Sequence, residues 1–281
     1  VNVFATGPID ALRKTMSGTE FLGYQTTEAD ASVRGIIAQN ELVEELSEVG
    51  HKDPIVLVLD GSPFYGESGG QVGDTGEIRG ESFTFKVSDT HREGDFILHI
   101  GHLLSGRVRL GERVHATVDA VRRAGIRRAH TATHLLHYAL RKFLGSHATQ
   151  AGSKVDDDYL RFDFTNAEAV RREDMEKIED EMNARVVEAA PVSWKTMPLA
   201  EAKKLGAMAL FGEKYGDTVR VVTTGDFSRE LCGGTHLDNT GQIGLVKITS
   251  EESVAAGTRR IVALTGPAEL RYVREKEARL H

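Results

Sequence analysis

The chain of 281 residues has a single cysteine, Cys232, and no apolar run near the roughly 20 residues that a membrane-spanning helix requires. One cysteine excludes an internal disulfide and fits a reducing compartment, so we expect a cytoplasmic protein. The N-terminus lacks the basic start and apolar core of a secretory signal, and it does not begin with methionine. We therefore expect a piece excised from a longer protein.

The chain also has no excess of basic residues: 35 Lys and Arg stand against 42 Asp and Glu, which gives a formal net charge of −7. A protein that coats nucleic acid needs Lys and Arg in excess over its contacting face, which disfavours that class. Local basic patches are still compatible with this charge, although such runs are more often solvated surfaces. The candidates are Arg122, Arg123, Arg127, Arg128, Arg141, Lys142, Arg259 and Arg260.

The first 120 residues are rich in strand and turn patterns. Ile55–Leu59 is typical of a buried strand, a glycine-dense loop follows it, and the alternating segment SFTFKVSD predicts another strand. ASVRGII, FILHIGHLL and RVHATVDA add further strand patterns. We predict a small, antiparallel β-barrel-like subdomain with an N-terminal extension over residues 1–120.

Helices and strands are mixed in the rest of the chain. A long helix is expected from Arg122 to about Leu144, ended by Gly145, and a second amphipathic helix ends before Pro191. The strand patterns are YLRFDFTN, VSWKTM, TVRVVTT, LVKITSEES and RRIVALTG. The fold class is therefore α+β, with helices on an antiparallel sheet in a two-layer domain over residues 121–267 and a linker helix starting in residues 268–281.

Three of the eleven histidines lie in the first of these helices, at His130, His134 and His137. His130 and His134 are four residues apart, a spacing that lets two imidazoles on adjacent turns bind one ion. This signal alone is weak, since paired helical histidines are more often core or surface residues.

A second pair lies about a hundred residues later, in the segment CGGTH. Cys232 and His236 are separated by a glycine-rich loop that can turn thiolate and imidazole toward one point. The four residues form a His3Cys set suited to Zn²⁺. His137 is a rival third ligand from the helix, but the two pairs already complete a tetrahedron. The segment HTATH has no glutamate after its first histidine, so it is not the metalloprotease motif.

Five segments together carry a resemblance to a known family. They are SPFYGESGGQVGDTG, RRAHTATHLLHYALRKFLGSHATQAGSKV, LRFDFTN, SRELCGGTHLDNTGQIGLVKI and AAGTRRIVALTG, which are spread over residues 62–266. In this order they resemble the editing region of alanyl-tRNA synthetase, which is also found as free-standing editing proteins. Nothing in the chain resembles the ATP-binding aminoacylation core.

The resemblance implies an aminoacyl-tRNA hydrolase that removes misattached serine or glycine from tRNA(Ala). Residues 121–267 would then be a zinc-containing editing domain, joined to the rest of a synthetase chain. The tRNA acceptor end is the implied partner and Zn²⁺ the implied cofactor. Two alternatives are a free-standing editing protein and a non-catalytic tRNA-binding module stapled by zinc.

The resemblance also implies roles for single residues. His130, His134, Cys232 and His236 align with zinc ligands, Thr133 with the residue that reads the serine hydroxyl, and Gln150 with a residue beside the substrate. We expect zinc to activate water or, as we prefer, to shape the pocket while Gln150 and the backbone amides of Gly233 and Gly234 act on water and the oxyanion. Arg259 and Arg260 are candidates for tRNA phosphates or for structural salt bridges.

One tripeptide, Gly69-Gly70-Gln71, is similar to a motif of release factors, which also cleave an ester on tRNA. Glycines before a β-hairpin more often supply positive-φ turns. We favour a scaffold role or a contact with the tRNA end over direct catalysis.

Overall fold

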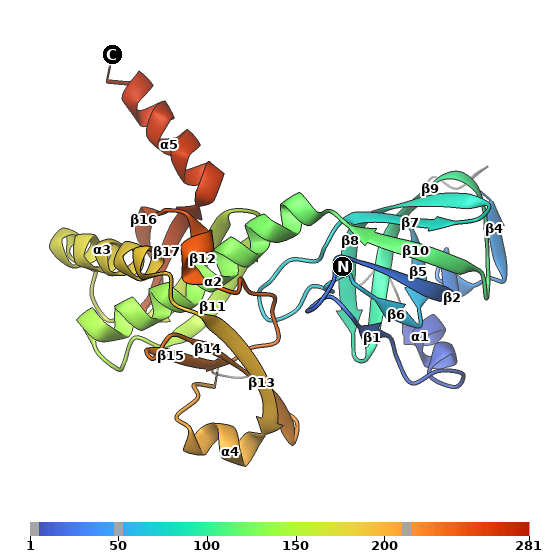
Figure 1. The fold of residues 1–281 in the computed structure, drawn as a ribbon, viewed down its shortest axis with the longest axis horizontal. Helices are drawn as coiled ribbons and strands as arrows, with labels where there is room; N and C mark the ends of the chain where they lie inside the picture. The colour runs from blue at the N-terminus through green and yellow to red at the C-terminus, as the bar shows by residue number, and fades with distance from the viewer. Residues whose placement is uncertain (1–5, 48–52, 210–214, 281) are drawn as a thin grey trace. The chain divides into compact units, whose positions relative to one another are not determined.

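A computed structural model describes residues 6–47, 53–209 and 215–280 (Figure 1). The chain divides into two units, one formed by residues 1–68 and 72–123 and the other by residues 69–71 and 124–281. The predicted boundaries after residues 120 and 267 stay predictions. None of the described helices is both long and apolar enough to cross a membrane.

The first unit is built around a closed antiparallel barrel of six strands. Their order is β10-β7-β8-β9-β5-β2, and a pairing of β10 with β2 closes the ring. The inward side chains, such as Leu57, Phe85 and Ile36, are completely buried, which is what strand patterns produce when one face is turned inward. The six strands are β2 (Glu28–Ala38), β5 (Ile55–Leu59), β7 (Gly76–Gly80), β8 (Phe83–Glu93), β9 (Phe96–Arg109) and β10 (Arg113–Val118).

Shorter elements surround the barrel. Helix α1 packs Ile9 and Leu12 against Val56 and Phe96 of the barrel wall in a second apolar cluster. The remaining elements are α1 (Thr6–Leu12), β1 (Glu20–Phe21), β3 (Glu41–Leu42), β4 (Glu45–Ser47) and β6 (Gly61–Ser62).

The second unit holds two antiparallel sheets and most of the helices. The four-stranded sheet has the order β11-β12-β17-β16, and the three-stranded sheet has the order β13-β14-β15. The strands are β11 (Gln150–Asp156), β12 (Tyr159–Thr165), β13 (Val192–Pro198), β14 (Thr218–Thr224), β15 (Ser228–Leu231), β16 (Val246–Ala255) and β17 (Thr258–Thr265).

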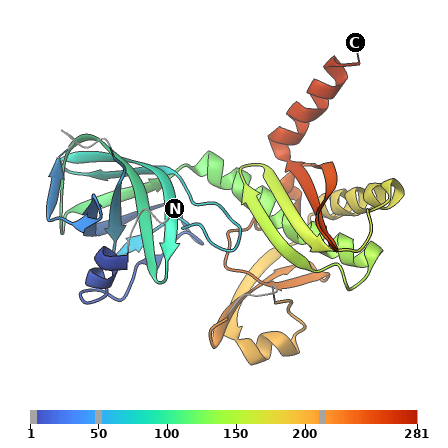
Figure 2. The same cartoon turned by 180° about the vertical axis from the view of Figure 1, so that it is seen from behind.

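The helices of this unit include the long helix that the sequence predicts. Helix α2 runs along the four-stranded sheet (Figure 2). The centre of its His137 ring lies 5.4 Å from the centre of the Phe162 ring in that sheet. Gly145 follows it with φ 113°, which explains why the helix ends there. The helical elements are α2 (Ala120–Leu144), α3 (Arg172–Glu188), α4 (Leu199–Lys204), η1 (Thr240–Ile243) and α5 (Gly266–Ala278).

The α+β class and the antiparallel barrel are confirmed, and the described residues form a six-stranded barrel, further antiparallel sheets and few helices. The predicted two-layer arrangement of helices on one antiparallel sheet stays a prediction, since the second unit contains two separate sheets. Sequence patterns missed β7, β11, β15 and α4, which are short and lack a clear period. They also treated Arg123 as a surface residue, but it is only 3% exposed and is paired with buried Asp74. Its guanidinium donates to the carbonyls of Gly23 and Pro63, so it belongs to the core of the first unit.

His99 supplies a pH-dependent element of this core. Its Nδ1 donates to the carbonyl of Leu57 at 2.9 Å, and its Nε2 lies 2.6 Å from the hydroxyl of Ser62. Burial lowers the pKa of His99 from 6.5 to about 4, while the bond to Leu57 acts in the opposite direction.

This shift predicts that acid destabilises the first unit. The unfolded chain takes up a proton near pH 6.5 and the folded chain only near pH 4, so His99 alone lowers the free energy of unfolding by about 3 kcal/mol as the pH falls between these values. Urea unfolding at several pH values, followed by circular dichroism, measures the effect. We expect His99→Gln to reduce the dependence of the unfolding free energy on pH, whereas substitution of the exposed His102 by Gln should leave it unchanged. Equal pH dependence in the unmodified protein and both variants would contradict the prediction.

Candidate metal centre

Helix α2 places two histidines on its buried face. His130 is 6% exposed and His134 3%, and both lie among completely buried residues of the same helix, Ala129, Leu135 and Leu136. The helix forms here because apolar residues recur at helical spacing, which buries this face. Histidines on it are therefore carried into the interior, and their rings lie 5.4 Å apart.

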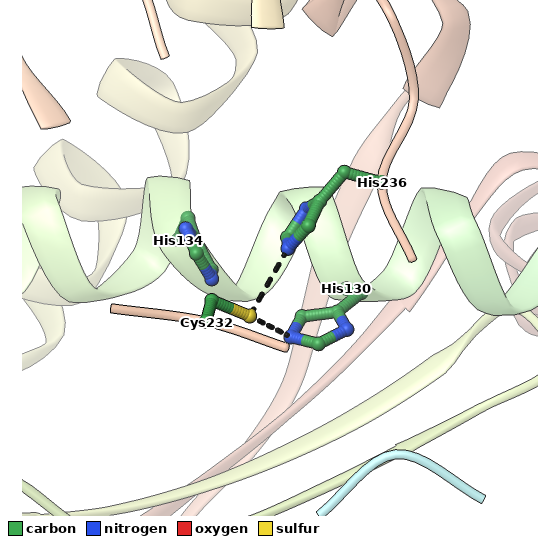
Figure 3. A group of neighbouring side chains, drawn as sticks. All are labelled: His130, His134, Cys232 and His236. Carbon is green, nitrogen blue, oxygen red and sulfur yellow. Dashed lines mark hydrogen bonds between the residues drawn. The ribbon is translucent and has the colours of Figure 1, made fainter. Parts of the chain in front are cut away.

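The loop after β15 brings the second pair to the same place. The Sγ atom of Cys232 lies 3.4 Å from Nε2 of His130 and 3.3 Å from Nε2 of His236 (Figure 3). One ligand atom from each of these residues and from His134 lies within 4.8 Å of the others. The predicted set of His130, His134, Cys232 and His236 is thus a possible metal site.

These distances fit a tetrahedral ion. Bonds of about 2.3 Å to sulfur and about 2.0 to 2.1 Å to nitrogen separate the two atoms by roughly 3.5 Å, close to the two distances observed. In addition, Nδ1 of His134 is buried without a hydrogen-bond partner among the described residues. Nε2 of His137 is buried without such a partner as well, although His137 is not among the clustered ligand atoms, so these nitrogens do not distinguish the ligands.

Gly234 permits the loop to approach the helix. A Cβ atom at this position would lie 2.0 Å from Cε1 of His130 and 2.8 Å from Oε1 of Gln71. Arg220 holds the loop from the other side, because its Nη1 donates to the carbonyls of Cys232 and Gly234 at 2.9 and 2.8 Å. The glycine is therefore required by close packing.

Gln71 orients His130. Its Oε1 accepts from Nδ1 of His130 at 2.8 Å and from the backbone N–H of Thr235 at 2.9 Å, while its Nε2 donates to the hydroxyl of Thr235. This arrangement places the ring proton on Nδ1 and leaves Nε2 free to bind metal. The sequence pattern had marked the GGQ tripeptide but not this contact, because nothing in its spacing links it to the helix.

Two further residues missed from the sequence support the other histidines. The hydroxyl of Thr131 is hydrogen-bonded to Nδ1 of His236 at 3.1 Å. Glu230 is buried, accepts from Nδ1 of His137 at 3.0 Å and lies 3.6 Å from Nε2 of His134. His137 thus contacts a carboxylate beside the ligand group and is not among the clustered ligand atoms.

The electrostatic environment keeps the ligand rings neutral. Burial lowers the pKa of His130 and of His236 well below 6.5, and neighbouring histidines and Arg220 lower it further. Burial also lowers the pKa of His134, although Glu230 opposes this. Burial alone would raise the pKa of Glu230, but His134, His137 and Arg141 together lower it. Neutral imidazoles beside a carboxylate can accept a metal cation.

The other predicted site residues have simpler surroundings. Thr133 is buried, and its hydroxyl donates to the carbonyl of Ala129 in its own helix at 2.8 Å. Gln150 is half-buried at the start of β11 and donates to the hydroxyl of Ser153. Their predicted catalytic roles, and the substrate-binding role of Gly233 and Gly234, stay predictions.

Arg259 and Arg260 both form ion pairs through two nitrogens. Arg259 donates to Glu251 at 2.5 and 2.8 Å, and Arg260 donates to Asp163 at 2.7 and 2.9 Å. The structural salt bridge, one of the two alternatives for this pair, is present. A contact with tRNA phosphates stays a prediction.

Comparison with known proteins identifies two matching families. Residues 5–122 match "tRNA synthetases class II (A)", and residues 219–262 match "Threonyl and Alanyl tRNA synthetase second additional domain". The alanine–tRNA ligase of Rhodopirellula baltica is 48% identical over 286 residues, covering 99% of this chain and 30% of the ligase. That of Acetivibrio thermocellus is 52% identical over 260 residues, covering 92% of this chain and 29% of the ligase. The chain therefore spans about 30% of the length of these relatives.

These findings correct the predicted identity and activity. The assignment to an editing region, the activity as an aminoacyl-tRNA hydrolase and the absence of an aminoacylation core are contradicted, because residues 5–122 match the class II synthetase family and neither matched family is described as an editing domain. The error has a clear origin. The match to the class II family extends over the barrel strands of residues 5–122. The resemblance to an editing region, in contrast, rested on five short motifs.

The close contact at Gly234 gives a test of the site geometry. We expect Gly234→Ala to displace His130 or the ligand loop and to lower the free energy of unfolding by about 1 to 3 kcal/mol, as overpacked sites do. Thermal unfolding measures the loss. Gly216→Ala is the matched control, because its Cβ would meet nothing closer than 4.0 Å; equal stability of the two variants would refute the proposed packing.

Proposed function

We propose that the chain is a section of an alanine–tRNA ligase and serves the attachment of alanine to tRNA(Ala). The observation that carries this proposal is 48% identity to such a ligase over 99% of the chain. Residues 5–122 contribute to the class II synthetase part, and residues 219–262 belong to the second additional domain. A cytoplasmic location, expected from the single cysteine, agrees with this role.

We further propose that His130, His134, Cys232 and His236 hold one Zn²⁺ ion. The donor set of three imidazoles and one thiolate suits zinc, and four protein ligands are typical of structural sites. Zinc bound here supplies a fixed positive centre that ties α2 to the loop after β15. Gln71 and Thr131 orient the rings of His130 and His236 through hydrogen bonds, and the carboxylate of Glu230 lies 3.6 Å from Nε2 of His134.

The partner is tRNA(Ala), whose acceptor end receives alanine. Gly233 and Gly234 belong to the ligand loop, and Thr133 and Gln150 come from α2 and the start of β11 in the same unit. We propose these residues as contacts of the acceptor end. Arg259 and Arg260 are proposed as contacts of its phosphates, in addition to their ion pairs.

The zinc proposal predicts one zinc ion per chain. Cys232→Ala should abolish stoichiometric zinc and lower the melting temperature by several degrees, because a structural zinc contributes directly to folding. Elemental analysis and thermal unfolding measure both effects. His147→Ala is a suitable control, since His147 is exposed and contacts Asn166 instead. Full zinc content in Cys232→Ala, or none in the unmodified chain, would refute the site.

The ligase proposal predicts that this chain can replace its counterpart in a known enzyme. In the Rhodopirellula baltica ligase, the aligned section would be exchanged for this sequence, and incorporation of labelled alanine into tRNA(Ala) would be measured. We expect the exchanged ligase to charge tRNA(Ala) at a rate within about tenfold of that of the parent ligase. This corresponds to a loss of no more than about 1.4 kcal/mol of transition-state stabilisation.

Deletion of the section provides the opposite test. If the section serves alanine attachment, a ligase lacking it should charge tRNA(Ala) more slowly by at least about tenfold. A deletion variant that charges at the full rate would show that this section is dispensable for the reaction and would overturn the proposal.

A further inference from the structure

Trp194 is the single tryptophan of the chain, and its side chain is 43% exposed. It lies opposite Val222 of β14, which lies opposite Glu230 of β15. Residues opposite one another in antiparallel strands point to the same face of the sheet. Trp194 therefore shares a face with Glu230, and two strand spacings place their backbones roughly 10 Å apart. The exposed ring lies on the face that adjoins the metal centre.

Arg220 links this ring to the ligand loop. Its guanidinium carbon lies 4.7 Å from the centre of the Trp194 ring. The same guanidinium donates to the carbonyls of Cys232 and Gly234, so its position is fixed by the loop that supplies two ligands. The guanidinium lies over one face of the Trp194 ring, so a fixed positive charge adjoins an aromatic surface that is still 43% exposed.

A surface of this kind matches an unpaired nucleobase of RNA. Bases in single strands stack on aromatic rings and on guanidinium planes, and the cation also attracts the backbone phosphates. The 3′ end of tRNA is single-stranded, and it is the end that accepts the amino acid.

We propose that Trp194 and Arg220 form a stacking surface for an unpaired base at the 3′ end of tRNA, beside the metal centre. The proposal rests on the proposed function, which supplies tRNA as the partner. It assigns to β13 and β14 a part of tRNA binding that neither the metal ligands nor Arg259 and Arg260 provide.

The single tryptophan is a direct reporter of this contact. The chain would be titrated with an RNA hairpin that carries the acceptor stem of tRNA(Ala) and its unpaired 3′ nucleotides, and with the same hairpin lacking those nucleotides. We expect the first RNA to quench Trp194 fluorescence and to bind at least about fivefold more tightly than the second, because one stacked base contributes at least that much affinity. Equal binding and equal quenching by the two hairpins would overturn the proposal.

Substitution of the ring gives an independent test. Trp194→Ala should weaken binding of the complete hairpin by about 5- to 150-fold, whereas Trp194→Phe, which keeps an aromatic face, should retain most of the affinity. Anisotropy of a labelled hairpin measures both. Leu270→Ala is the matched control, because Leu270 is similarly exposed, at 47%, but lies in α5.

The outcomes separate this inference from the proposed function. Zinc content and melting temperature of each variant show whether the fold is intact. Unchanged binding by a folded Trp194→Ala protein overturns the stacking surface, even if the exchanged section still supports charging of tRNA(Ala) in the ligase. Failure of charging in that ligase overturns the proposed function, whatever the hairpins do.

Discussion

The candidate metal centre depends on the close approach of Gly234 to the ring of His130. No side chain larger than hydrogen fits between them, since a Cβ atom would lie 2.0 Å from the ring. This contact brings Cys232 and His236 to a helix that lies about a hundred residues earlier in the chain. Arg220 and Gln71 hold the loop in place through its backbone and Thr235. The packing of one glycine thus decides whether two weak ligand pairs become one site.

Around this contact, each ligand ring is fixed by a different segment. Gln71 comes from the segment of residues 69–71, which belongs to the second unit, Thr131 from α2 itself and Glu230 from β15. Such partners set which ring nitrogen carries the proton, and they also raise the basicity of the other. Among the described residues, Glu230 has the only carboxylate within ion-pair distance of a ligand ring, that of His134, and it also pairs with His137. The site therefore combines buried neutral rings with nearby negative charge, which favours a bound cation.

The ligand set does not specify the reaction. A His3Cys cluster is compatible with a structural ion in many kinds of protein, because folds and metal sites serve unrelated functions. The editing assignment came from a resemblance of short segments, and the match of residues 5–122 to class II synthetases contradicts it. The chemistry of the cluster is unaffected by that correction. The loop that carries Cys232 also fixes Arg220, whose guanidinium lies over the ring of Trp194.

Local patterns in the sequence determined the long helix α2, the strands β5 and β14, and the types and spacings of the four candidate ligands, because helical period, strand alternation and ligand spacing are properties of neighbouring residues. They did not reveal Gln71 and Glu230 beside the ligands, the burial of Arg123, or the placement of Trp194 on the metal-centre face. These depend on contacts between residues distant in the chain, up to 164 positions apart for Gln71 and Thr235. Only the tertiary structure decided them, since a side chain's partners are set by which surfaces pack together.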